Sequence, residues 1–175
     1  MFSAEDFAHI LPNGWLVQFT SMTAMKRLPK EFAEMQDAAK CPPGVHADLV
    51  DGNMFHWKLK ITGPAGTPYE GGIFNADLTF PEKFPFQGPT FKFQTKIYHP
   101  NVSQEKQGGE GTPGEMCLGE WAPKTKIVGL LSTVMGLLAN PNKEHVVDAE
   151  IGREYVENRA EFNRKAKEWT AKYAK

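Results

Sequence analysis

The sequence has 175 residues, 41% of them hydrophobic, which suits one compact domain whose core needs no metal or disulfide. Its 20 basic and 21 acidic residues are mixed along the chain, and the net charge of −1 argues against nucleic acid or an anionic membrane as a partner and favours proteins. Residues 1–10 lack a secretion signal and no stretch reaches the roughly 20 apolar residues of a membrane span, so we expect a soluble protein of the cytoplasm, the nucleus or both.

The two cysteines of the chain, Cys41 and Cys117, could form one disulfide at most, and they lack the paired spacing of a zinc site. We therefore expect two free thiols in a reducing compartment and no bound metal.

The first twenty residues show no sustained hydrophobic period, and Pro12, Asn13 and Gly14 interrupt them. We interpret residues 1–20 as an N-terminal extension and residues 21–175 as the domain. Its first predicted element is a helix, because apolar residues between Met22 and Met35 recur at steps of three and four. Ser21 or Thr23 is the expected cap of this helix.

Four strands are predicted next. Residues 45–50 and an alternating run from 54 to 61 surround Asp51-Gly52, which is typical of a hairpin. A third strand alternates apolar and polar residues over 74–80, and a short fourth strand contains Phe91 and Phe93.

The pattern changes beyond residue 97, because glycine and proline are dense over residues 108–114 and preclude regular structure. Helical spacing returns over 127–138, over 148–155 and over 162–173. A helix, four strands with short connections, a long loop and further helices indicate an α+β fold, with an antiparallel sheet whose helices pack against one face.

Cys117 lies in the predicted loop. A lone cysteine is often a small buried core residue, but a loop can also expose a thiol. A cysteine hydrolase would need a histidine as base, and the inventory of histidines leaves that class open. The five histidines are His9, His46, His56, His99 and His145.

Several motifs in one order indicate a more specific interpretation. From about Met25 to Lys175 the chain resembles the ubiquitin-conjugating enzyme family, and the match is specific because the motifs occur together. They are residues 54–57 (MFHW), 68–72 (PYEGG), 80–81 with 84–86 (FP, FPF), 97–101 (IYHPN), 117–118 (CL), Trp121 with Pro123, 140–142 (NPN) and the tail 163–174.

The resemblance implies that Cys117 accepts the C-terminus of ubiquitin, as a thioester, from the activating enzyme. The modifier then passes to a substrate lysine or to a ligase cysteine, with no cofactor, metal or ATP site on this chain. It further implies that the side-chain amide of Asn101 supports the loop beside the cysteine and stabilises the developing oxyanion. Without the resemblance, an asparagine in a turn would be interpreted as satisfying its own backbone. His99 and Pro100 of the same motif have the structural role of bracing the turn.

Partner surfaces also follow from the resemblance. Phe86 and the segment Trp121, Ala122 and Pro123 match two loops that bind ubiquitin ligases. Lys26, Arg27 and Lys30 match a basic stripe on the first helix that meets the activating enzyme. Without the resemblance, this stripe would be interpreted as a solvated helix face and Phe86 as a core residue.

Two departures from the family pattern affect the site. Asn101 and Cys117 are sixteen positions apart (117 − 101), which is longer than in the family, whereas Trp121 follows Cys117 after only four. We expect the added Gly- and Pro-rich length to form a mobile flap, with the insert Val102–Gly114 controlling access to the thiol.

The second departure is His145, which stands where many members have an acidic residue or a serine that deprotonates the attacking lysine. A histidine there is associated with transfer to ligase cysteines.

Two alternatives stay open at the level of sequence. The first is the same chemistry with another ubiquitin-like modifier, of the NEDD8 or SUMO type, with residues 1–20 as a docking arm. The second is a non-catalytic member of the family that acts as a binding module.

Overall fold

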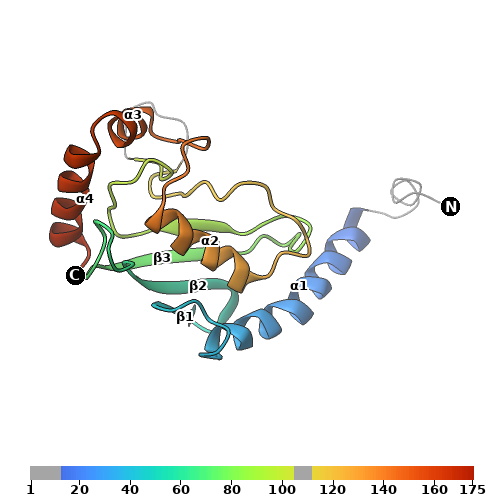
Figure 1. Cartoon of the computed structure of the whole chain (residues 1–175). Coiled ribbons are helices and arrows are strands. Elements are labelled where there is room, and N and C mark those ends of the chain that lie inside the picture. Colours follow the sequence, from blue (N-terminus) through green and yellow to red (C-terminus); the bar gives the residue numbers. More distant parts are fainter. Residues whose placement is uncertain (1–12, 105–111) are drawn as a thin grey trace.

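The computed structural model describes the backbone of residues 13–104 and 112–175, and the side chains from Met22 onward. It contains four helices and four strands within these ranges (Figure 1). In chain order they are α1 (Asn13–Gln36), β1 (Val45–Val50), β2 (Asn53–Thr62), β3 (Ile73–Thr79), β4 (Thr90–Phe93), α2 (Ile127–Ala139), α3 (Ala149–Glu157) and α4 (Arg159–Tyr173).

The sheet has the order β1-β2-β3-β4, and every neighbouring pair is antiparallel. Asp51 and Gly52 form the first turn with positive φ angles of 50° and 73°. These angles explain the Asp-Gly pair, since aspartate and glycine tolerate this region better than other residues do. The predicted hairpin is therefore confirmed, with a bulge between Leu49 and Val50 at its end.

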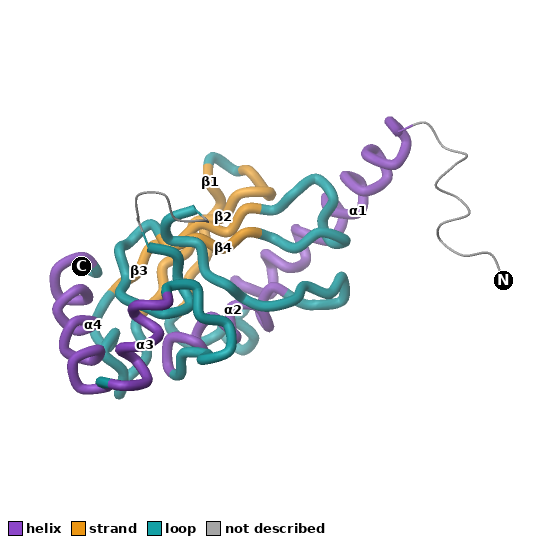
Figure 2. Tube along the Cα trace, turned by 90° about the horizontal axis from the view of Figure 1, so that it is seen from above, coloured by secondary structure: helices purple, strands orange, loops and turns teal. Residues whose placement is uncertain are grey.

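One face of the sheet is buried and the other is polar. Trp57, Leu59 and Ile61 of β2 are buried, whereas Lys58 and Lys60 between them are exposed. α2 lies across the sheet, α3 and α4 pack together at one end, and α1 runs past the other end (Figures 1 and 2). The predicted α+β fold, with helices against one face of an antiparallel sheet, is confirmed.

The start of the first helix was predicted wrongly. α1 begins at Asn13, so Ser21 and Thr23 lie inside it rather than at a cap. Gly14 falls in the first turn of the helix and does not interrupt it. The N-terminal part of α1 projects beyond the body of the domain, and Met22 and Met25 are 56% and 62% exposed (Figures 1 and 2).

The three later helices agree closely with the predicted ranges, and two have side-chain caps. Asp148 accepts hydrogen bonds from the backbone N–H groups of Glu150 and Ile151 at the start of α3. Asn158 caps α4 in the same way. Within residues 13–104 and 112–175, no helix has both the length and the apolar character needed to cross a membrane.

Candidate functional site

Cys117 lies in the loop between β4 and α2, directly after a short pairing of two chain segments. Val102 pairs with Met116, and both side chains are buried, so the residue before Cys117 is fixed to the core. The N–H of Cys117 donates to the carbonyl of Asn101 at 3.0 Å. Cys117 itself is half-buried and, like Cys41, is a free thiol, as expected. The backbone of this cysteine is therefore held, while the residue is only half-buried and its thiol is free.

The turn before Cys117 requires a glycine at position 114. Gly114 has a φ of +86°, and a Cβ added there would lie 2.1 Å from the carbonyl oxygen of Phe93. Only glycine fits this approach of two backbones. The rest of the glycine-rich insert, residues 105–111, lies outside the described residues, so the expected flap stays a prediction.

The thiol faces a groove of about 340 Å³ between the Cys117 loop and α2. Its described lining is mostly apolar and includes residues before and after Cys117 in the loop. The lining residues are Pro89, Phe91, Glu115, Met116, Cys117, Leu118, Gly119, Glu120, Trp121, Thr125, Leu130 and Thr133. A groove of this kind suits an extended chain end brought to the sulfur.

Asn101 is fully buried, and both hydrogens of its side-chain amide are used in hydrogen bonds. The amide nitrogen donates to the carbonyls of Asn142 and His145, each at 2.7 Å. The amide oxygen accepts from the N–H of Asn142 at 2.8 Å. Because an amide nitrogen has only two hydrogens, none is left for an oxyanion in this conformation. The geometry favours the bracing role of Asn101 over the oxyanion role.

His99 is also fully buried, and both of its ring nitrogens are engaged. Nδ1 accepts from the N–H of Asn101 at 3.0 Å, so Nε2 carries the hydrogen and donates to the carbonyl of Leu137 at 2.9 Å. Burial lowers the pKa of His99 to about 4, which keeps the ring neutral. This placement agrees with a bracing role and leaves His99 unsuited to act as a base.

His145 lies in the loop between α2 and α3 and is exposed. The loop is fixed to the His99–Asn101 segment, because the N–H groups of Val147 and Asp148 both donate to the carbonyl of Pro100. With the contacts of Asn101, these bonds hold the backbone at His145 while its imidazole faces solvent. Pro100 itself is buried at the centre of this arrangement.

The hydrolase arrangement that the sequence left open finds no support in the described residues. None of the groove-lining side chains is a histidine. His46 and His56 lie on strands β1 and β2, and His99 has no free ring nitrogen. His145 is exposed on the loop between α2 and α3 and does not line the groove. His9 lies outside the described part of the chain.

The expected ligase-binding loops differ in exposure. Phe86 is 60% exposed, so it is a surface residue and not part of the core. Trp121 is half-buried, its ring N–H donates to the carbonyl of Pro85 at 2.6 Å, and its ring lies 5.8 Å from that of Phe84. Ala122 and Pro123 follow at the surface, half-buried and exposed respectively. The two loops are therefore in contact, with Phe86 projecting from them.

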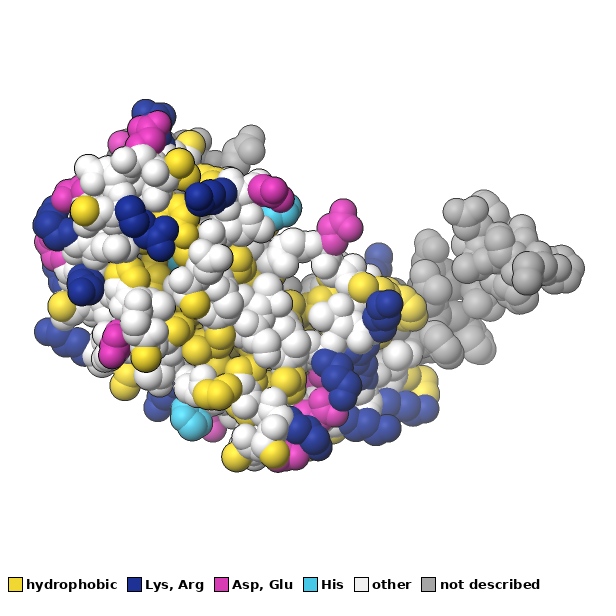
Figure 3. All heavy atoms as spheres, in the orientation of Figure 1, with side chains coloured by type: hydrophobic (Ala, Val, Ile, Leu, Met, Phe, Trp, Pro, Cys, Tyr) yellow, Lys and Arg dark blue, Asp and Glu magenta, His cyan; other side chains and the backbone are white. Residues whose placement is uncertain are grey.

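The basic residues of α1 also differ from one another. Lys26 and Lys30 are exposed, and Lys and Arg side chains gather over α1 (Figure 3). Arg27 is instead turned toward the loop after Cys117, with only 21% of its side chain exposed. A shared role in binding the activating enzyme stays a prediction for all three.

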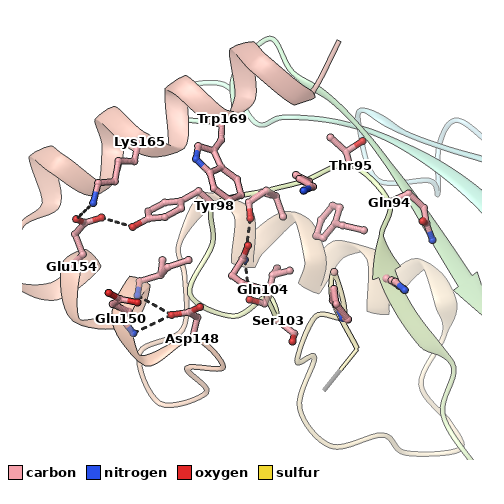
Figure 4. Close-up of a pocket in the computed structure, with 18 residues that line it drawn as sticks. Gln94, Thr95, Tyr98, Ser103, Gln104, Asp148, Glu150, Glu154, Lys165 and Trp169 are labelled. Carbon is pink, nitrogen blue, oxygen red and sulfur yellow. Dashed lines mark hydrogen bonds and ion pairs between the residues drawn. The ribbon is translucent and has the colours of Figure 1, made fainter. Parts of the chain in front are cut away.

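A second and larger cavity, of about 610 Å³, lies between the loop after β4 and the two C-terminal helices (Figure 4). The hydroxyl of Tyr98 donates to Glu154 at 2.6 Å, and Glu154 also pairs with Lys165 at 2.6 Å. The ring of Tyr98 packs on Trp169 at 5.4 Å. Since Tyr98 precedes His99, this network ties the bracing segment to α3 and α4. The sequence analysis did not single out Glu154 or Lys165.

The fold and the cysteine define a class of protein. They are those of the ubiquitin-conjugating fold, with a free thiol on a loop that is hydrogen-bonded to the segment of Asn101. The family model for ubiquitin-conjugating enzymes matches residues 27–170. The chain is 41% identical over 158 residues to ubiquitin conjugating enzyme E2 B of Dictyostelium discoideum, covering 88% of this chain and all of the relative. The E2 domain of a Toxoplasma gondii ubiquitin conjugating enzyme superposes with a TM-score of 0.73 at 38% identity, covering 86% of this chain and 99% of that one.

The chain therefore belongs to the ubiquitin-conjugating enzyme family, a family of transferases that works with a modifier, an activating enzyme and ligases. The resemblance found in the sequence motifs is confirmed.

Proposed function

We propose that this chain accepts ubiquitin as a thioester on Cys117 and transfers it to a substrate lysine or to a ligase cysteine. The observation that carries the proposal is the half-buried free thiol of Cys117, a residue that lines a groove formed by its own loop, the β4 region and α2. Family membership supplies the reaction class, and the relative from Dictyostelium discoideum favours ubiquitin over other modifiers.

The first reaction is an exchange of thioesters. The Cys117 thiolate attacks the carbonyl carbon of the thioester between the modifier and the activating enzyme. A new C–S bond forms to Cys117, and the cysteine of the activating enzyme leaves as its thiolate. Because a thiolate both enters and leaves, the step consumes no cofactor and needs no dedicated base at the site.

In the second reaction an amine or a thiol attacks the carbonyl, and Cys117 leaves as the thiolate. An attacking ligase cysteine requires no help with its proton beyond its own ionisation. An attacking lysine must lose a proton, and His145 is the residue that we propose to receive it. The imidazole of His145 is exposed to solvent and is not held against the attacking amine, so we expect transfer to thiols to be favoured.

Partner binding is assigned to the end of the molecule where α1 meets the two loops. We propose that Lys26, Arg27 and Lys30 meet the activating enzyme and that Phe86, Trp121, Ala122 and Pro123 meet ligases. The 60% exposure of Phe86 supports this, since large exposed apolar side chains are common anchors of protein interfaces. We place the protein in the cytoplasm, the nucleus or both.

The test is charging with defined partners. The protein is mixed with ATP, an activating enzyme and its cognate modifier, in separate reactions for ubiquitin and for modifiers of the NEDD8 and SUMO types. We expect an adduct that is sensitive to reductant with ubiquitin. An adduct with a different modifier alone would reassign the substrate, and no adduct with any of them would support a binding module instead.

A further inference from the structure

Arg27 is a residue of α1 whose guanidinium is committed to the loop after Cys117. Its Nη1 donates to the carbonyl of Pro123, and its Nη2 donates to the carbonyl of Thr125 at 2.6 Å. Its Nε pairs with Glu31 on the next turn of α1 at 2.9 Å. One planar group therefore joins the helix to two carbonyl groups of the loop.

The same guanidinium also supports an aromatic stack behind the groove. It lies 5.1 Å from the centre of the Phe84 ring, within the range of a cation–π contact. The Phe84 ring packs in turn on Trp121, with 5.8 Å between centroids. Arg27 thus binds the segment from Trp121 to Thr125 directly, at two carbonyls. It also supports this segment indirectly, through the Phe84 ring that packs on Trp121.

Trp121 and Thr125 are both lining residues of the groove beside Cys117, whereas Arg27 is not. Only four positions separate Cys117 from Trp121, so the thiol and this wall of the groove belong to one short segment. Gly88 allows the close packing, because a Cβ there would lie 2.7 Å from the Trp121 ring. Arg27 therefore binds this wall through hydrogen bonds and through Phe84, and Gly88 leaves the space that the Trp121 ring needs.

We propose that Arg27 is a positioning residue that sets this wall of the groove for the C-terminal tail of the modifier. The inference rests on the proposed function. Arg27 acts through Trp121 and Thr125 and does not touch the reacting atoms. Loss of its bonds frees the wall, so the tail binds more weakly, while the Cys117 thiol keeps its reactivity. Lysine cannot replace it fully, because a single ammonium cannot reproduce the planar fork that serves three acceptors.

The test omits the activating enzyme, since Arg27 is also a proposed contact of that partner. Cys117 is charged chemically by a thioester of a peptide with the sequence of the last residues of ubiquitin. A thioester of N-acetylglycine with the same leaving group serves as the tail-free substrate. Charging is a single-turnover reaction followed by intact mass, with Cys41→Ser as the background in every variant. KM here is the thioester concentration that gives half of the maximal rate of Cys117 acylation, and kcat is that maximal rate.

For Arg27→Ala we expect KM for the tail thioester to rise roughly five- to tenfold, the factor that corresponds to losing one or two hydrogen bonds. We expect kcat to change less than about twofold, and the N-acetylglycine thioester to react as with the parent protein. Arg27→Lys should recover part of the loss in KM, and it carries the test if the alanine variant does not fold.

Two variants serve as matched controls. Glu34→Gln removes the charge of the ion pair that α1 makes with Lys126 at 2.7 Å, close to the Arg27 contacts, and neither residue lines the groove. Met25→Ala removes an exposed neighbour of Arg27 on the same helix. Both should keep the parent KM for the tail thioester.

An unchanged KM in Arg27→Ala would overturn the proposal. An equal slowing with both thioesters would also overturn it, because the thiol itself would then be disturbed. Failure of the proposed function gives a different result, namely no charging by any activating enzyme. The comparison between the parent protein and Arg27→Ala on the chemical thioesters does not depend on that result.

Discussion

Glu31 of α1 accepts a hydrogen bond from the backbone N–H of Ile127, the first residue of α2, at 2.9 Å. The residue before α2, Lys126, provides no side-chain cap, so a carboxylate from another helix satisfies this donor. Glu31 is only 6% exposed, and it also pairs with Arg27. One buried carboxylate therefore caps α2 and orients the guanidinium that holds the wall of the Cys117 groove.

We expect Glu31→Ala to lower the free energy of unfolding by about 1–3 kcal/mol, because it leaves the Ile127 N–H and the Nε–H of Arg27 without their acceptor. Urea unfolding followed by circular dichroism measures the change. Glu34→Ala, which removes the exposed pair with Lys126, should stay close to the parent protein. A loss in Glu34→Ala as large as that in Glu31→Ala would contradict the capping role.

His99 predicts a dependence of stability on pH. Its pKa of about 4 in the folded protein lies below the ordinary value near 6.5, so the unfolded chain binds the proton first as the pH falls. The contribution of His99 to stability is complete above about pH 6.5 and is lost between about pH 6.5 and 4, by about 3 kcal/mol at most.

The measurement compares urea unfolding near pH 7 and near pH 4.5 for the parent protein and His99→Gln. Glutamine does not titrate, so we expect the difference between the two pH values to shrink by most of that amount. The same difference in both proteins would show that other groups cause the pH dependence.

Asn101 predicts a coupling between loop order and transfer. Asn101→Ala leaves the carbonyls of Asn142 and His145 unpaired, and we expect it to cost roughly 2 kcal/mol of stability or more. Hydrogen exchange of residues 140–148 should rise in parallel with the loss of transfer. Slower transfer with unchanged protection of this loop would instead favour a direct role at the oxyanion.

His145 predicts the preferred acceptor. We expect the charged protein to discharge readily to free cysteine and poorly to free lysine. His145→Asp should raise discharge to lysine roughly tenfold, a modest gain for a positioned base, and leave discharge to cysteine unchanged. Rapid discharge to lysine that survives His145→Ala would count against this role.

The elements with strong periodicity could be predicted from the sequence because local pattern and burial agree in them. The alternation of β2 matches its buried and exposed faces, and Asp148 and Asn158 cap helices near the predicted starts. The N-terminal turns of α1 could not be predicted this way, since they project beyond the body, where no core imposes a period. Met22 and Met25 share the spacing of Leu28 but not its burial.

The candidate site could be predicted at the level of motifs but not of contacts. The order of motifs located Cys117, Asn101 and His145, which the fold brings to one region through contacts between distant segments. The inward turn of Arg27 was not visible, because its partners Pro123 and Thr125 are about a hundred positions away. Its four-residue spacing to Glu31 was the available signal, since residues at that spacing are neighbours on a helix.

The central claim is that Cys117 carries the modifier, and the mass of the charged protein tests it most directly. The protein, Cys117→Ser and Cys41→Ser are each incubated with the activating enzyme, ATP and ubiquitin, and intact masses are recorded before and after reductant. We predict one added ubiquitin that reductant removes in the parent protein and in Cys41→Ser. Cys117→Ser should show either no adduct or an ester that resists reductant. A reductant-sensitive adduct that persists in Cys117→Ser and disappears in Cys41→Ser would contradict the claim.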